Sequence, residues 1–323
     1  MEWWIYVLLA LVVLVLLPAL LVSGVIYTVL LVRTSRDKFG RKCSFPDDEE
    51  YVRMFNIGLA WGEKWKDRKR DVNIVSDGLH LVGEYYDFGG KTAVIIIAGR
   101  TECLLYSYYF AEPFRRAGCN VLVIDNRAHG LSEGRVSCLG YKEYRDILRW
   151  CELLHDELGN EKVLLHGICI GASTALFAAT DAHCPDYVAG MSAEGMYVNF
   201  YESFLNHLRL DRPKAPHFPV LQMTMLMIRL FSGADVVNDG PIKRIGKLKK
   251  PILFLHSRED QFSTPDQAEL LYENCTAPKQ LVWFDRGAHS RIRINNTEKY
   301  DETIVGFVQQ LDDPLFFPIN ACI

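Results

Sequence analysis

The chain has 323 residues, 49% of them hydrophobic, and carries a formal net charge of -4 at pH 7. This length and composition can bury one large core, so we expect a single globular domain with an additional N-terminal segment. A slightly acidic chain lacks the overall positive field of nucleic-acid-binding proteins, which excludes nucleic acid as an expected partner.

The cysteines indicate the redox environment. Nine cysteines are scattered along the chain, with no Cys-x-x-Cys pair and no Cys/His spacing typical of zinc sites. An odd number of unpatterned cysteines predicts free thiols in a reducing compartment, and no metal site is expected.

A long apolar segment opens the chain. Residues 3–32 carry no charge, and this run is longer than the ~20 residues that a helix needs to cross a bilayer. A cleavable signal peptide is the competing interpretation, but Met1 and Glu2 supply no basic residue and the run is longer than a signal core. We therefore expect residues 1–34 to form a transmembrane anchor.

The charges beside this segment predict its orientation. Only Glu2 precedes it, whereas basic residues follow it directly: Arg33, Arg36, Lys38, Arg41 and Lys42. The positive-inside rule then predicts a single-pass protein of the cell membrane whose C-terminal part is cytoplasmic.

Residues 35–70 are expected to link the anchor to the globular domain. The basic stretch is followed by four acidic residues at 47–50 and then by an apolar-periodic run, a pattern typical of a helix start. Strand-like alternation on both sides of Ser76-Asp77-Gly78 predicts a β-hairpin over 71–88. We place the globular domain at 71–323.

Strand-like and helix-like segments then alternate. Short apolar runs predict strands at 93–97, 120–124, 162–165, 187–191, 251–255 and 280–284. Helical periodicity predicts helices at 106–116, 141–158, 172–180 and 298–311. This order is typical of an α/β fold with a mostly parallel, doubly wound sheet covered on both faces.

The alternation stops between Glu194 and Lys250. The Met-rich segment there, about 195–248, is predicted to be a helical lid insertion over the functional site.

A candidate nucleophile lies between a predicted strand and a predicted helix. The sequence Gly167-Ile168-Cys169-Ile170-Gly171 has the small residues that a sharp strand-to-helix turn requires on both sides of an exposed central side chain. The alternative is a buried structural cysteine between two glycines.

An acid and a histidine follow in the order that a catalytic triad of this kind requires. Asp260 comes after the predicted strand at 251–255, and Glu259 beside it is an alternative acid. His289 lies between the last predicted strand and the last helix. The histidines at 129, 166 and 256 lie in predicted turns and strands, where we expect structural roles.

A family resemblance adds to these residues. The stretch Asp125-Asn126-Arg127-Ala128-His129-Gly130-Leu131-Ser132 is similar to the Asp-x-Arg-Gly-His-Gly-x-Ser loop of α/β-hydrolases, and Gly99-Arg100-Thr101-Glu102 resembles a Gly-Arg-x-Glu motif of bacterial lysophospholipases. The resemblance is to the serine-aminopeptidase-like and monoacylglycerol-lipase or lysophospholipase branch, and it covers residues 71–323.

The resemblance implies an oxyanion hole. One backbone amide would come from Arg100 or Thr101 and the other from Ile170, and two such amides stabilise a transition state by several kcal/mol. Glu102 is a candidate neighbour of the thiol, although a loop carboxylate is more often a surface residue or a partner of Arg100.

Two residues depart from the family pattern: Cys169 replaces the usual serine, and Ala98 replaces the usual histidine of the oxyanion loop. Dienelactone hydrolases use cysteine on this fold, so the first departure is compatible with catalysis and equally with weakened activity. Ser173, an alternative nucleophile, lies one helical turn beyond the elbow and is expected to point into the core.

These features predict a membrane-anchored hydrolase of ester, thioester or amide bonds with a Cys169–His289–Asp260 triad. Its expected substrate is a small or lipid-like acyl compound, and no cofactor is implied. The alternative is a catalytically silent binding or sensor protein of the same fold; the sequence does not specify an oligomeric state.

Overall fold

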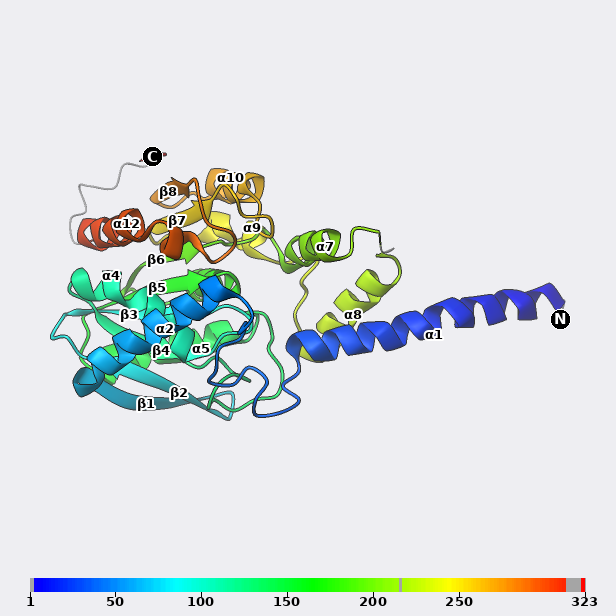
Figure 1. Ribbon diagram of the computed structural model, residues 1–323, viewed down its shortest axis with the longest axis horizontal. Helices are drawn as coiled ribbons and strands as arrows, with labels where there is room; N and C mark the ends of the chain where they lie inside the picture. Colours follow the sequence, from blue (N-terminus) through cyan, green and yellow to red (C-terminus); the bar gives the residue numbers. More distant parts are fainter. Residues whose placement is uncertain (1–2, 215–216, 312–320, 323) are drawn as a thin grey trace.

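The computed structural model describes residues 3–214, 217–311 and 321–322. Its centre is one twisted sheet with strand order β1-β2-β4-β3-β5-β6-β7-β8-β9 (Figure 1). The strands are β1 (Lys69–Ser76), β2 (Leu79–Tyr86), β3 (Thr92–Ile97), β4 (Asn120–Ile124), β5 (Lys162–Ile168), β6 (Val188–Glu194), β7 (Ile252–Ser257), β8 (Lys279–Phe284) and β9 (Ala321–Cys322).

The sheet is mostly parallel, as predicted. Strand β2 runs antiparallel to β1 and β4, and every other neighbouring pair is parallel. The predicted hairpin is confirmed, since β1 and β2 pair from Lys69 with Tyr86 to Ser76 with Leu79. The carboxyl ends of β3, β5, β6 and β7 therefore meet at one edge of the sheet.

Helices cover both faces because the central strands are apolar on both sides. One face packs against α5 (Glu143–Glu152), α6 (Ile170–Ala179) and α10 (Pro265–Asn274). The other packs against α2 (Glu49–Lys64), α4 (Ala111–Arg116) and α12 (Thr297–Gln310). The remaining short helices are α3 (Leu104–Ser107), α9 (Pro241–Arg244) and α11 (Ile292–Asn295).

The helix that follows the basic stretch contributes to the core. Asp48 caps α2, because its Oδ1 accepts a hydrogen bond of 2.8 Å from the amide of Tyr51. The apolar face of α2 buries Tyr51, Met54 and Trp61 against the sheet. The globular domain therefore includes α2 as one of its covering helices.

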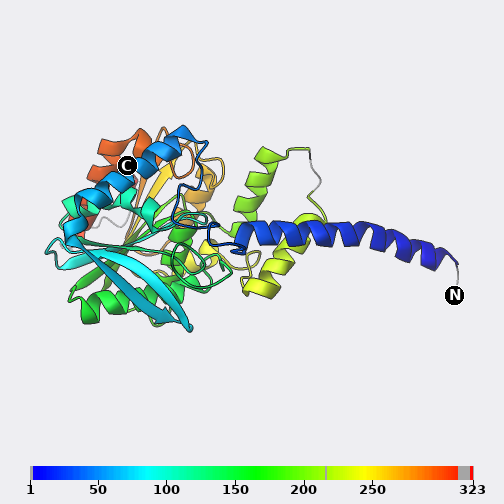
Figure 2. The same ribbon diagram turned by 60° about the horizontal axis from the view of Figure 1, so that its bottom comes forward.

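The predicted insertion contains α7 (Phe200–Asp211) and α8 (Val220–Ser232), and α8 packs on the N-terminal helix α1 (Trp3–Leu31). Figures 1 and 2 show α1 extending far from the sheet, with α8 lying across its inner part. The buried side of α1 repeats every four residues, at Ala19, Ser23, Tyr27 and Leu31. Within the described residues, α1 alone is long and apolar enough to cross a bilayer.

Polar contacts join α1 to the lid. The Ser23 hydroxyl donates to the carbonyl of Val220 at 3.0 Å, and the Tyr27 hydroxyl lies 3.3 Å from that of Ser232. The end of α1 also joins the domain, where Val32 pairs with Val136 in an antiparallel bridge.

Candidate active site

Cys169 occupies a strained turn between a strand and a helix. Strand β5 ends at Ile168 and α6 begins at Ile170, and Cys169 between them has φ 55° and ψ -115°. A non-glycine residue rarely adopts a positive φ, and such strain is found where a side chain must be presented for function. The Cys169 amide donates to the carbonyl of Glu194 at 2.9 Å, which fixes the turn against β6.

The two flanking glycines are required by close backbone approach. A Cβ at Gly167 would lie 2.3 Å from the carbonyl oxygen of Gly171, and a Cβ at Gly171 would lie 2.0 Å from that of Ile97. Backbone atoms cannot yield at such distances, so only glycine fits at either position. This is the steric reason for the Gly-x-Cys-x-Gly spacing.

Asp260 and His289 meet beside this turn. Nδ1 of His289 lies 2.7 Å from Oδ2 of Asp260. The other carboxylate oxygen of Asp260 accepts hydrogen bonds of 2.9 Å from the amides of Phe262 and Ser263. Burial tends to raise the pKa of Asp260, but the charge of His289, its hydrogen bond and the hydrogen bond from the Ser263 amide outweigh burial and lower the pKa. The carboxylate is therefore held ionised and in a fixed orientation.

The environment of His289 favours its charged form. Burial tends to lower the pKa of His289, but the charges of Asp260 and Cys169 raise it well above its ordinary value. Nε2 is buried and makes no hydrogen bond within the described residues. Since Nδ1 is occupied by Asp260, Nε2 is the nitrogen that can exchange a proton with the Cys169 thiol.

Glu259 and Ser173, the alternative acid and the alternative nucleophile, lie in surroundings that differ from those of Asp260 and Cys169. Oε2 of Glu259 accepts a hydrogen bond of 2.8 Å from the amide of Gly287, so this carboxylate holds the loop that carries His289. Ser173 is fully buried in α6 beside Tyr197. The expectation that Ser173 points into the core is confirmed.

The loop after β3 fixes the position of Glu102, for which the sequence left a position near the thiol, a surface position and a pairing with Arg100 open. The Glu102 carboxylate accepts hydrogen bonds from the Thr101 amide at 3.2 Å and from the Tyr51 hydroxyl at 3.4 Å. Within the described residues, Glu102 forms no ion pair with Arg100. The amide of Thr101 is thus occupied, because the side chain of Glu102 folds back on its own loop.

The other two candidate oxyanion amides have no such acceptor. No hydrogen bond engages the Arg100 amide in the described part of the chain, and the Ile170 amide belongs to the first turn of α6, where helix geometry supplies no acceptor. The carbonyl of Arg100 lies 2.6 Å from Nε2 of His129, which fixes this loop. Arg100 and Ile170 are therefore the amides available to an oxyanion.

Cys169 and His289 border a cavity of about 400 Å³. Apolar side chains of Phe200, Phe204 and Leu208 on α7 line it, together with Leu30 at the end of α1. Charged and polar side chains also line it, among them Asp48, Tyr51, Arg100, Glu102, His207, Asp211 and Arg291. The cavity thus has both apolar and charged walls. Within the described residues, no group of three or more His, Cys, Asp or Glu side chains could hold a metal ion.

Gly195, which no motif of the sequence indicates, lies against the Asp260–His289 pair. It has φ 60°, and a Cβ there would lie 3.2 Å from Cε1 of His289 and 3.5 Å from Oδ2 of Asp260. Its only sequence signal is its place directly after β6, at the edge of the sheet where the other candidate residues lie.

We expect Gly195→Ala to lower kcat by about 10- to 100-fold, because a displaced histidine loses its alignment with the thiol. The matched control is Gly78→Ala, which has φ 75° but no atom within 4 Å of the added Cβ. Both variants should lose about 1 kcal/mol of stability from the backbone strain alone. Equal kcat values for the two variants would contradict a supporting role for Gly195.

Glu194 is a second buried acid near the site. Burial raises its pKa to about 7, although a hydrogen bond from Tyr300 and the charges of His289 and Arg293 act in the opposite direction. The Tyr300 hydroxyl donates to Oε2 at 2.7 Å, while Oε1 is buried and makes no hydrogen bond within the described residues.

This raised pKa predicts a pH-dependent stability. Between the ordinary pKa of a glutamate and about pH 7, the folded state holds a proton that the unfolded state releases, so stability falls as pH rises through this window. Glu194→Gln cannot titrate, so its stability should not fall in this window. The free energy of unfolding of the variant minus that of wild type should therefore increase by about 3 kcal/mol from pH 4 to pH 8. Unfolding of both proteins in detergent at the two pH values measures this difference. Glu269→Gln, at an exposed position, is the control. A difference between Glu194→Gln and wild type that does not change with pH would contradict the prediction.

Comparison with known proteins agrees with this geometry. Residues 92–214 match the family model for the alpha/beta hydrolase fold. The protein YqkD of Bacillus subtilis (strain 168) is 31% identical over 221 residues, which cover 68% of this chain and 72% of that protein.

Solved structures resemble the chain over most of its length. The Pyrococcus furiosus esterase Pf2001 has a TM-score of 0.65 at 20% identity, covering 77% of this chain and 93% of the esterase. The Paleococcus ferrophilus monoacylglycerol lipase has a TM-score of 0.52 at 19% identity, covering 72% of this chain and 99% of the lipase. The sheet order, the Cys169 turn and these matches together establish that the chain belongs to the α/β-hydrolase family.

Proposed function

We propose that this protein is a membrane-anchored hydrolase that cleaves ester, thioester or amide bonds of acyl amphiphiles through Cys169, His289 and Asp260. The observation that carries the proposal is the strained Cys169 turn beside a histidine whose Nδ1 lies 2.7 Å from a buried carboxylate. A purely structural cysteine has no need of a positive φ or of a neighbouring ionised acid–histidine pair.

Acylation begins with transfer of the thiol proton from Cys169 to Nε2 of His289. The thiolate attacks the carbonyl carbon of the substrate, and the carbonyl π electrons move to oxygen, where the amides of Arg100 and Ile170 donate hydrogen bonds. When the tetrahedral intermediate collapses, the bond to the leaving group breaks and His289 protonates the departing alcohol, thiol or amine. Asp260 stabilises the imidazolium throughout these steps.

Deacylation uses the same groups. His289 removes a proton from water, the resulting hydroxide attacks the acyl carbon, and the intermediate forms at the same two amides. Its collapse breaks the C–S bond, and His289 returns the proton to the sulfur of Cys169. The acid product leaves and the free thiol is restored.

The packing of α1 supports an anchor that stays on the mature protein. Leu31 is fully buried, Tyr27 and Ser23 pack against the lid, and Leu30 lines the cavity. Removal of this segment as a signal peptide would expose the lid and open one wall of the candidate site. The structure of α1 thus favours retention over cleavage.

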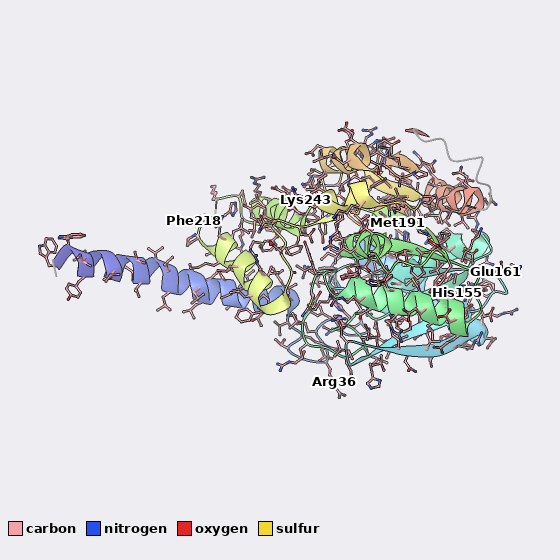
Figure 3. All side chains as sticks on the ribbon, turned by 180° about the vertical axis from the view of Figure 1, so that it is seen from behind. Arg36, His155, Glu161, Met191, Phe218 and Lys243 are labelled. Atoms are coloured by element: carbon pink, nitrogen blue, oxygen red, sulfur yellow. The ribbon has the colours of Figure 1, made fainter. Side chains whose placement is uncertain are left out.

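The length of α1 supports a site at the membrane surface. The first ~20 residues of the helix span about 30 Å, the thickness of the hydrocarbon layer, so the part that contacts the lid begins near the interface. Figure 3 shows Phe218 at the outer end of the lid, where it is 75% exposed. Leu226 and Leu230 of α8 are exposed as well. Exposed apolar side chains near the membrane interface suit contact with lipid and entry of an amphiphile.

The basic residues after α1 support a cytoplasmic location of the domain. Arg33 also fixes the end of the helix to the domain, because it donates to the carbonyl of Gly130 at 2.6 Å and to that of Ser132 at 3.0 Å. Lys38 caps the end of the helix, because it donates to the carbonyls of Thr28 and Val32 at 2.6 Å each. The anchor therefore meets the domain without a flexible connection.

Turnover by the full chain in lipid nanodiscs tests the proposal. The substrates are esters, thioesters and amides of matched acyl chains from two to sixteen carbons, and Cys169→Ala serves as the blank. Hydrolysis that requires Cys169 and increases with chain length is expected. If wild type and blank are equally inert on every substrate, the silent binding function replaces the hydrolase.

A further inference from the structure

Helix α7 of the lid makes two contacts with the loop that carries Asp260, and both are to Phe262. The side-chain amide of Asn206 donates to the carbonyl of Phe262 at 3.1 Å. The imidazole of His207 stacks on the ring of Phe262, with the ring centroids 3.7 Å apart and the planes 8° from parallel. Helix α7 therefore holds Phe262 both by its backbone and by its side chain.

Phe262 in turn contacts both members of the acid–histidine pair. Its amide donates to Oδ1 of Asp260 at 2.9 Å. Its ring lies edge to face against the imidazole of His289, with centroids 5.6 Å apart and planes at 83°. Because the contact between Asp260 and His289 is a single one of 2.7 Å, a displaced Phe262 would disturb both of its ends.

His207 is held in one form by its own helix. Its Nδ1 lies 2.8 Å from the carbonyl of Ser203, and a carbonyl only accepts, so Nδ1 carries a hydrogen. Burial lowers the pKa of His207, the charges of His289 and Arg100 act in the same direction, and the Ser203 hydrogen bond opposes them only in part. The ring can thus stack on Phe262 without placing a second positive charge beside His289.

We propose that Asn206 and His207 are positioning residues of the reaction, which hold Phe262 and through it keep Asp260 oriented toward His289. This inference rests on the proposed function and gives the lid a role beyond covering the cavity. With α7 in place, Asp260 is fixed from the lid side as well as from its own loop. A chain from which α7 has moved away keeps the Cys169 turn but has a less well oriented acid.

The two side chains of α7 could instead act on the substrate, because His207 lines the cavity. In that case their removal would weaken binding of the substrate, and the loss would not depend on Asp260. Positioning through Asp260 predicts the opposite, since a group that acts through the acid has no effect once the acid is removed. The informative quantity is therefore the loss of kcat with and without the acid.

A double-mutant cycle measures this quantity. The full chain in lipid nanodiscs hydrolyses a fatty acyl ester, and kcat and KM are determined for Asn206→Ala, His207→Ala and His207→Phe, each with Asp260 and with Asp260→Asn. Leu208→Ala is the matched control. Leu208 lines the same cavity from the same helix, but its side chain can neither hydrogen-bond to Phe262 nor stack on it.

We expect Asn206→Ala and His207→Ala to lower kcat by about tenfold while KM changes by less than about threefold. His207→Phe should restore most of the loss, because it keeps a ring on Phe262. With Asp260→Asn, the alanine changes should cost less than about twofold. Leu208→Ala should instead raise KM by the same factor in both backgrounds. Equal losses of kcat with and without Asp260 would overturn the inference.

Titration of the His289 imidazole by NMR tests the same contact without turnover. Since Asp260 raises the pKa of His289, that pKa should fall in Asn206→Ala by more than in Leu208→Ala, which reports any effect of a wider cavity alone. If Asn206→Ala leaves the pKa unchanged, the positioning role is wrong even when esters are hydrolysed. If the pKa falls but no ester is turned over, the contact from α7 to Asp260 stands and the hydrolase function fails.

Discussion

Asp260→Asn should lower kcat by about 10³- to 10⁴-fold, because the geometry of the loop forces the wrong histidine tautomer. Oδ1 of Asp260 is held by the amides of Phe262 and Ser263, at 2.9 Å each, so an asparagine would keep its oxygen there. Its NH₂ group would then face Nδ1 of His289, which must become the acceptor. The proton would move to Nε2, where it prevents removal of the thiol proton from Cys169.

Steady-state hydrolysis of a fatty acyl ester by the full chain measures this effect. Glu259→Gln is the matched control, since it neutralises the adjacent acid while keeping an oxygen to accept the 2.8 Å hydrogen bond from Gly287. We expect the control to retain kcat within about tenfold of wild type. A larger loss in Glu259→Gln than in Asp260→Asn would reassign the acid.

Cys169→Ala should reduce turnover by about 10⁴-fold or more, since the remaining groups supply no nucleophile. Cys169→Ser should lie between wild type and Cys169→Ala, because a hydroxyl gives up its proton only in the transition state and His289 must remove it there. The control is Cys184→Ala, which removes another partly buried thiol at a distance from the site.

The same variants test the electrostatic coupling of the site. The charge of Cys169 contributes to the raised pKa of His289, so this pKa should fall in Cys169→Ala. Imidazole titration by NMR measures the change. An unchanged pKa of His289 would indicate that thiol and imidazole do not interact, and Cys169→Ser more active than wild type would indicate that cysteine has weakened a serine-type site.

The sheet and the candidate triad could be predicted because their sequence signals are local. Apolar runs such as 93–97 specify buried strands of a parallel sheet, and the glycines around Cys169 reflect contacts of 2.0 to 2.3 Å that no other residue allows. Asp260 could be recognised by its place after a strand, although only the structure distinguishes its contact with His289 from the contact of Glu259 with Gly287.

The contribution of α1 to the site could not be predicted. An apolar helix has no periodic difference between its faces, so the sequence does not show that Ser23 and Tyr27 pack on the lid or that Leu30 lines the cavity. The surroundings of Glu102 could not be predicted either, because the sequence left a position near the thiol, a surface position and a pairing with Arg100 open. The fold directs Glu102 to the Thr101 amide and Arg100 to the carbonyl of Leu30.

The predicted helix at 106–116 also differs in form. The structure has two short helices there, Leu104–Ser107 and Ala111–Arg116, joined by a tighter turn at Tyr108–Phe110. The consecutive aromatic side chains at 108–110 are all buried, which a regular helix on the surface of a sheet cannot achieve. Tertiary packing therefore determined the local geometry.

Detection of an acyl group on Cys169 is the most direct test of the proposed chemistry. The full chain is mixed with a fatty acyl thioester, quenched in acid within the first turnover and digested, and the peptide that contains Cys169 and Ser173 is fragmented by mass spectrometry. We predict the acyl mass on Cys169, removable by neutral hydroxylamine and absent from Cys169→Ala. Turnover with an unmodified Cys169, or with the acyl group on Ser173, would contradict the account.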